Sequence, residues 1–244
     1  MTALEIAVQD VAGAVASATL GADRLELCAA LAVTGGITPS IGLLDATLAA
    51  VPSSVGVHVL VRPRAGSFVY SPEELAVQVG DVRAAVRAGA GGVVVGALRP
   101  DGSVDRDAIA RLLEAADGRE VTFHRAFDTL HELAPAVDEL VSLGVVRVLT
   151  SGGAVRSIDG LARLAETVRH AAGRLQVMAG GGVRPDDIPA LLGTGIDAVH
   201  LSASRHVAES GGPGGGSAGY TTTDAAVVAA AAAALDPVDR LQPS

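Results

Sequence analysis

The chain has 244 residues and a formal net charge of −9, with 49% hydrophobic residues but only 2% aromatic ones. Its acidic balance argues against a nucleic-acid partner, which needs a basic patch to displace counterions. The most apolar stretch, residues 225–235, is too short to span a bilayer, so we expect no membrane partner. The N-terminus lacks a basic region followed by an apolar one, which favours a cytoplasmic location.

Two residue types limit the chemistry further. Cys28 is the only cysteine, which excludes an intrachain disulfide and every multi-cysteine zinc or iron-sulfur site within one chain. All 18 Lys+Arg residues are arginines, so a lysine Schiff base, a pyridoxal phosphate linkage and a Walker A loop are excluded as well.

Short runs rich in β-branched and aliphatic residues recur along the chain and alternate with stretches of helical spacing. The predicted strands are residues 4–8, 24–28, 57–61, 92–95, 121–124, 146–150, 175–179 and 198–202. Alternation of buried strands and helices is the pattern of parallel βαβ units. The sequence therefore predicts an α/β fold, a (β/α)8 TIM barrel of eight parallel strands with outer helices, and we expect one domain over residues 1–244.

Helix boundaries agree with this arrangement. Ser71 precedes Pro72 and Glu74 in the pattern of a capping box, and this helix is predicted to run to about Gly89. Asp105 is positioned to cap a second helix, and residues 184–187 (RPDD) open a shorter one.

A glycine-rich loop is predicted at residues 208–220, between the eighth strand and the last helix. Residues 211–219 contain six glycines and one proline, a composition typical of loops. Composition leaves two interpretations open, a lid over the site or a flexible insertion without function.

Ionisable residues interrupt five of the predicted strands, although strands covered by helices should be apolar throughout. Alternation along each strand points these side chains into the barrel. They are Glu5, Glu26, His58, His124 and His200. A structural ion pair explains each of these residues taken alone. Burying ionisable groups on five strands, however, costs so much free energy that stabilising a core is a poor explanation of the whole set. With Asp128, they form the predicted catalytic set, because the carboxyl ends of barrel strands carry active sites.

Arginines and glycines near the same strand ends predict a small anionic ligand. Guanidinium groups bind carboxylate or phosphate in bidentate fashion, and the loops after strands seven and eight often form a barrel's phosphate site. The predicted substrate-binding residues are Arg62, Arg64, Arg125, Ser151, Gly180, Gly181 and Ser202.

Seven segments together resemble the CutC family, in order along the chain. They are residues 21–28 (GADRLELC), 35–40 (GGITPS), 61–64 (VRPR), 121–128 (VTFHRAFD), 147–152 (RVLTSG), 178–183 (MAGGGV) and 199–202 (VHLS). The resemblance implies a cytoplasmic barrel protein associated with copper homeostasis, with intracellular copper binding or handling. Relatives often carry cysteines on the first strand, where this chain has Ala7 and Val8.

Two classes of function follow. If copper binds, Cys28 and Met178 are the predicted metal ligands, because Cu(I) prefers thiolate and thioether sulfur. The alternative is a TIM-barrel enzyme that acts on a small anionic or sugar-like substrate through the Glu, His and Arg pocket, with a divalent metal or none. We also expect a homo-oligomer, a dimer, because barrels commonly pair.

Overall fold

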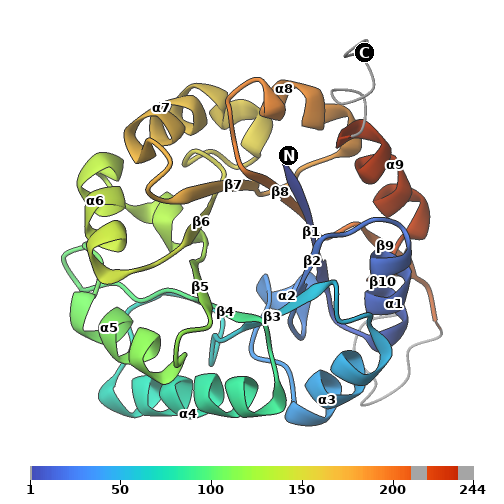
Figure 1. The fold of residues 1–244 in the computed structure, drawn as a ribbon, viewed down its shortest axis with the longest axis horizontal. Helices are drawn as coiled ribbons and strands as arrows, with labels where there is room; N and C mark the ends of the chain where they lie inside the picture. The colour runs from blue at the N-terminus through green and yellow to red at the C-terminus, as the bar shows by residue number, and fades with distance from the viewer. Residues whose placement is uncertain (1, 210–218, 236–244) are drawn as a thin grey trace.

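The computed structural model describes residues 2–209 and 219–235, and its first eight strands close into a parallel barrel in chain order (Figure 1). Strand β1 pairs with β2 on one side and with β8 on the other. The strands are β1 Ala3–Val8, β2 Arg24–Leu27, β3 Gly56–Leu60, β4 Gly92–Val95, β5 Glu120–Phe123, β6 Arg147–Thr150, β7 Gln176–Gly180 and β8 Ala198–Leu201. The predicted (β/α)8 barrel is confirmed, and each predicted strand is present within one or two residues of its expected bounds.

In the described residues, eight helices form a ring outside the barrel, namely α1 Val11–Thr19, α3 Ile41–Ala50, α4 Pro72–Ala88, α5 Arg106–Ala115, α6 Leu133–Leu143, α7 Leu161–Ala171, α8 Ile188–Leu192 and α9 Ala225–Leu235. The short helix α2 Leu31–Thr34 lies inside this ring, next to β2 and β3 (Figure 1). Ser71 and Glu74 complete the expected capping box of α4, and Gly89 ends that helix in the left-handed conformation. Asp105 caps α5 through the amide of Ala108.

The main apolar core lies between the strands and the helices, where side chains such as Ile6, Leu25 and Val93 are fully buried. Two small apolar clusters lie inside the barrel. One contains Cys28 with Leu60 and Val94, and the other contains Met178 with Leu149 and Ala198. Polar and ionisable side chains fill much of the remaining interior, which is the unusual feature of this barrel.

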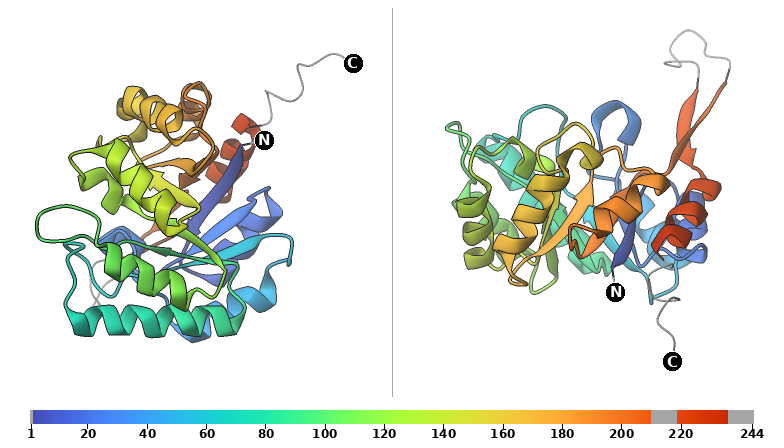
Figure 2. Two further views of the ribbon diagram at one scale, coloured as in Figure 1. Left: turned by 60° about the vertical axis from the view of Figure 1, so that its left-hand side comes forward. Right: turned by 90° about the horizontal axis from the view of Figure 1, so that it is seen from above.

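An antiparallel hairpin, β9 Ser204–Val207 and β10 Tyr220–Thr223, follows the barrel strands and is not among the elements predicted from the sequence. Figure 2, right, shows it projecting beyond the barrel on the side opposite the N-terminus. The predicted loop over residues 208–220 overlaps β10 only at Tyr220, an aromatic residue that, with the three threonines after it, suits a strand better than a loop. Most of the glycine-rich segment, and with it the predicted lid, lies outside the described residues.

No helix within residues 2–209 or 219–235 combines the length and the apolar character that a bilayer crossing needs.

We predict that Gly92→Ala destabilises the fold. A Cβ atom at Gly92 would lie 2.6 Å from His58 Cε1 and 2.7 Å from the carbonyl oxygen of Glu120, inside the closed barrel. Overpacking of this kind lowers the free energy of unfolding by about 1–3 kcal/mol, which urea denaturation would measure. The matched control is Gly42→Ala on α3, where no atom lies within 4 Å and helix propensity favours alanine by up to about 1 kcal/mol. Equal stability of Gly92→Ala and the wild type would contradict this packing.

Candidate functional site

A buried carboxylate, Glu5 in the middle of β1, anchors the polar interior. Arg24 Nε on β2 donates a hydrogen bond to Glu5 Oε2, and His200 Nδ1 on β8 lies 2.7 Å from Glu5 Oε1. Burial alone favours the neutral acid, but the hydrogen bond with His200 and the charges of His200 and Arg24 outweigh it and hold the pKa of Glu5 well below its usual value. Glu5 is therefore a permanent anion with both oxygens occupied.

His200 links this anion to a second carboxyl group. Its Nε2 atom lies 3.8 Å from Glu26 Oε2. Burial alone favours the neutral imidazole, but the hydrogen bond with Glu5 and the charge of Glu26 raise the pKa of His200. Burial raises the pKa of Glu26 to about 7 despite the opposing charge of His200, with a smaller contribution from Glu5. A carboxyl group poised near neutrality has the protonation behaviour of a general acid or base.

His58 belongs to a different layer, at the amino end of the barrel. Its Nε2 atom lies 3.7 Å from Glu120 Oε2 at the start of β5, and Arg147 donates to the same oxygen at 2.9 Å. Arg147 also bonds the side chains of Thr122 and Gln176. Burial lowers the pKa of His58 to about 4, so its ring is neutral. The structure therefore places His58 away from Glu26, His124 and His200, the predicted catalytic residues that lie at the carboxyl end.

A pocket of about 240 Å³ opens at the carboxyl end of the barrel. The polar side chains that line it are Glu26, Arg62, His124, Arg125, His200 and Ser202. Its wall also includes the turn of Gly181 and Gly182 that follows β7. Seven of the predicted site residues, these six side chains and Gly181, thus line one cavity, and Ser202 among them directly follows β8.

Arg62 follows β3 and is held in place by backbone carbonyl groups. Its Nη1 atom donates to the oxygens of Thr34 and Gly36 at 2.8 and 2.9 Å, and its Nη2 atom to that of Gly66 at 3.2 Å. The guanidinium also lies over the Phe68 ring, with Cζ 5.3 Å from the centroid. Arg62 therefore shapes and charges the pocket wall, and most of its donors are already used.

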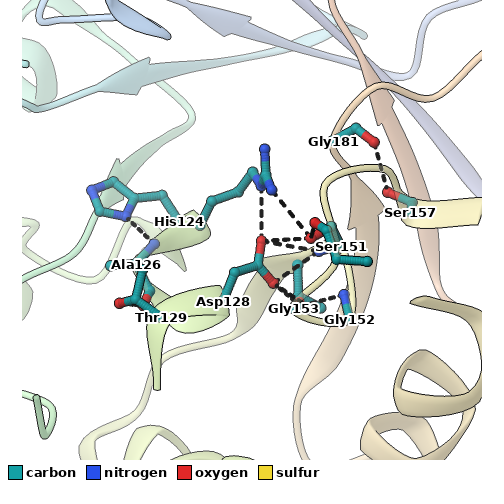
Figure 3. Close-up of polar contacts among 12 residues, drawn as sticks. His124, Ala126, Asp128, Thr129, Ser151, Gly152, Gly153, Ser157 and Gly181 are labelled. Atoms are coloured by element: carbon teal, nitrogen blue, oxygen red, sulfur yellow. Dashed lines mark hydrogen bonds and ion pairs between the residues drawn. The ribbon is translucent and has the colours of Figure 1, made fainter. Parts of the chain in front are cut away.

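His124 is a neutral histidine with an assignable tautomer. Its Nδ1 atom accepts a hydrogen bond from the Ala126 amide at 3.2 Å, so the proton of a neutral ring is on Nε2 (Figure 3). Burial and the charge of Arg62 lower the pKa of His124 to about 3. Gly96 leaves room for the ring, since any Cβ there would collide with it, and Phe68 packs on it with centroids 4.8 Å apart.

Asp128 orients Arg125 and does not itself line the pocket. It accepts hydrogen bonds from Arg125 Nε at 2.8 Å, from the Ser151 amide and hydroxyl, and from the Gly153 amide (Figure 3). Ser151 in turn accepts from Arg125 Nη2 at 3.1 Å. The edge of the guanidinium formed by Nε and Nη2 is thereby fixed, and Asp128 and Ser151 act as positioning residues for Arg125.

Two glycines on and after β7 are required by close packing. A Cβ atom at Gly181, whose φ is +125°, would lie 3.0 Å from Arg125 Cζ, so only glycine lets the guanidinium approach this turn. A Cβ atom at Gly180 would collide with Leu149 and would lie 3.1 Å from His200 Cβ. Gly180 therefore packs the strands and is not among the pocket-lining residues.

Three other predicted site residues lie away from the pocket. Arg64 pairs with Glu74 at the start of α4 and stacks over Tyr70, which makes it a structural residue. Cys28 is fully buried in its apolar cluster, and Met178 accepts a hydrogen bond from Arg24 Nη2 at 3.3 Å.

Two buried arginines, Arg24 and Arg147, belong to the polar interior but are absent from the predicted set. Arg24 lies two residues before Glu26 on β2, and Arg147 lies two residues before Leu149 on β6. Since side chains two residues apart on a strand share a face, alternation is the signal that could have placed both inside the barrel.

The fold and the pocket define a TIM-barrel protein with an ionisable site at the carboxyl ends of its strands. The model of the CutC family matches residues 2–205, so the chain belongs to that family. A relative from Agrobacterium fabrum, named family protein CutC, is 46% identical over 82% of this chain and 79% of its own length. The human copper homeostasis protein cutC homolog is 40% identical over 85% of this chain and 75% of its own. A solved structure of a candidate copper homeostasis protein CutC from Streptococcus agalactiae has a TM-score of 0.78 at 31% identity, covering 83% of this chain and 99% of that one. The family is thus associated by name with copper homeostasis.

We predict that Glu26→Gln makes stability less dependent on pH. The pKa of Glu26 in the folded protein, about 7, lies above its ordinary value of 4.5. Its stabilising contribution is therefore fully present below about pH 4.5 and is lost as the pH rises through 7. The free energy of unfolding of Glu26→Gln minus that of the wild type should grow by on the order of 3 kcal/mol between pH 4.5 and 8. Urea denaturation at both pH values would measure this, with the exposed Glu114→Gln as surface control, and a constant difference would contradict the raised pKa.

Proposed function

We propose that the chain is an enzyme that binds a small anionic molecule in the carboxyl-end pocket and transfers a proton through Glu26. The observation that carries this proposal is the Glu26 carboxyl group, buried beside His200 with a pKa of about 7. Structural carboxylates in this barrel, such as Glu5, are fully paired and strongly acidic. Among the described residues none donates a hydrogen bond to Glu26, which suits a group that must gain and lose a proton.

The guanidinium of Arg125 supplies the anchor for the anion. Asp128 and Ser151 hold the one edge of Arg125 that Nε and Nη2 form, and the Gly181 turn lies against the same guanidinium. An arginine fixed in this way on a pocket wall presents a directed positive charge, which suits a carboxylate or phosphate group. Arg62 adds a second positive charge on the β3 side of the same cavity.

We predict that Arg125 controls anion binding. Calorimetric titration with inorganic phosphate at pH 7.5 should show binding to the wild type, and Arg125→Met should weaken it at least about 10-fold through loss of a charge-assisted hydrogen bond. Arg64→Met removes an arginine that lies outside the pocket and serves as the matched control, with unchanged affinity expected. Thermal unfolding checks that both variants are folded. Equal phosphate binding by Arg125→Met and the wild type would contradict the proposed anion site.

The names of relatives connect the family with copper homeostasis, but the ligands predicted in this chain do not fit a Cu(I) site. The Cys28 thiol contacts the carbonyl oxygen of Val8 at 3.5 Å, and burial, followed by the charge of Glu26, raises its pKa, which disfavours the thiolate. The Met178 sulfur is next to the Arg24 cation and belongs to a separate apolar cluster. Within residues 2–209 and 219–235, no group of three or more His, Cys, Asp or Glu side chains could hold a metal ion.

We predict that Cys28→Ala leaves Cu(I) binding unchanged. A competition titration with a chromophoric Cu(I) chelator would compare the apparent affinities of the wild type and the variant. Equal affinities are expected because a protonated, buried thiol is a poor ligand. A loss of affinity of about 10-fold or more in Cys28→Ala would instead support direct copper handling through this residue.

The homodimer expected from the sequence stays a prediction.

A further inference from the structure

We propose that His124 is a catalytic hydrogen-bond donor to a carbonyl oxygen of the substrate, and that the substrate is a small anionic carbonyl compound. This inference rests on the proposed function and adds to it the substrate class and the reaction type. It gives His124 one specific role within the catalytic set predicted from the sequence.

The first support is an unsatisfied donor. His124 is 5% exposed, and its Nε2 atom has no hydrogen-bond partner among the described residues. Because Nδ1 accepts from the Ala126 amide, Nε2 carries the proton and needs an acceptor. A buried donor left without a partner is rare and unfavourable, so its retention in a pocket wall points to a ligand oxygen as partner.

The second support is the placement of His124 relative to Glu26. Both side chains line the same cavity. Glu26 is on β2, and His124 directly follows β5, which lies three strands further around the ring (Figure 1). A molecule between them meets a carboxylate base on one side and a neutral donor on the other. Arg125 next to the Gly181 turn holds its anionic group. A carboxylate base, a neutral imidazole and an anion site together suit proton abstraction next to a carbonyl group.

The reaction balances without another reactant. The Glu26 carboxylate removes a proton from the carbon next to the carbonyl, and the C–H electron pair forms a carbon–carbon double bond. The carbonyl π electrons move to the oxygen, which becomes an enolate stabilised by the His124 Nε2–H group. In a substrate with a hydroxyl group on the deprotonated carbon, Glu26 then returns its proton to the former carbonyl carbon. The hydroxyl proton passes to the enolate oxygen, so the product is an isomer and nothing is oxidised or reduced overall.

Two phosphate-containing probes separate this inference from the proposed function. Phosphoglycolohydroxamate carries a planar group that resembles an enolate, whereas glycerol 3-phosphate carries only the anionic group and hydroxyls. The wild type should prefer the hydroxamate by at least about 100-fold, the lower end for mimics of a transition state. His124→Leu should remove most of that preference while glycerol 3-phosphate affinity stays within about twofold, and His124→Gln, which retains an N–H donor, should recover part of it.

The outcomes are distinct. If the wild type binds glycerol 3-phosphate but shows no preference for the hydroxamate, the role of His124 is wrong and the anion site stands. If the wild type binds neither probe, the proposed function fails with it. Equal loss of both probes in His124→Leu would make His124 an anion contact and overturn the inference.

A measurement on the unaltered protein guards against variants that do not fold. Long-range proton–nitrogen spectra of ¹⁵N-histidine-labelled protein should show His124 as the neutral Nε2–H tautomer from about pH 5.5 to 8, as its geometry requires. A charged ring, or a proton on Nδ1, at neutral pH would overturn the assignment.

Discussion

The pairing of Glu5 with Arg24 and His200 is the interaction on which the interior of this barrel depends. A fully buried carboxylate would cost several kcal/mol if it were unpaired, so each of its oxygens must be satisfied. Strand register provides this, because Arg24 on β2 and His200 on β8 stand opposite Glu5 on either side. Since His200 is 195 residues from Glu5 in the sequence, the pair forms only when the barrel closes. Closure of the fold and assembly of the site are therefore one event.

The same pairing decides the chemistry above it. Because His200 Nδ1 is hydrogen-bonded to Glu5, only the Nε2 atom of this ring is available to interact with Glu26. Glu26 lacks an arginine partner of its own among the described residues, which leaves desolvation as the largest influence on its pKa. Two carboxyl groups in adjacent strands thus differ in character, one permanently ionised and the other near neutrality. The reason is that His200 hydrogen-bonds to Glu5 alone and the guanidinium of Arg24 also pairs only with Glu5.

Sequence patterns are sufficient for the barrel and for part of the site. The periodicity of the strands and the polar residues within them correctly place Glu26, His124 and His200 among the side chains that line the carboxyl-end pocket. Periodicity shows which face of a strand a residue is on, but not how far along the barrel axis it lies. The pattern therefore groups His58 with the pocket residues, although His58 pairs with Glu120 in the layer at the amino end.

Closeness in sequence also does not show which way the side chains of a loop point. Arg62 and Arg64 are two residues apart, yet only Arg62 faces the pocket, because Glu74 on α4 captures Arg64. The Arg64–Glu74 ion pair forms because α4 begins close to the loop after β3. This position of α4 is a property of the assembled barrel and not of the local sequence pattern.

The hairpin that follows β8 has a consequence for the rim of the pocket. The Gln9 side chain at the end of β1 donates to the carbonyl oxygen of Thr221 in β10 and accepts from the amide of Leu31, which lines the pocket. One amide group thus fastens the hairpin and the pocket rim together. Strand β10 lies beyond the region matched by the family, residues 2–205. A substitution in β10 can therefore reach the pocket rim through Gln9 while leaving every acid–base group of the interior in place.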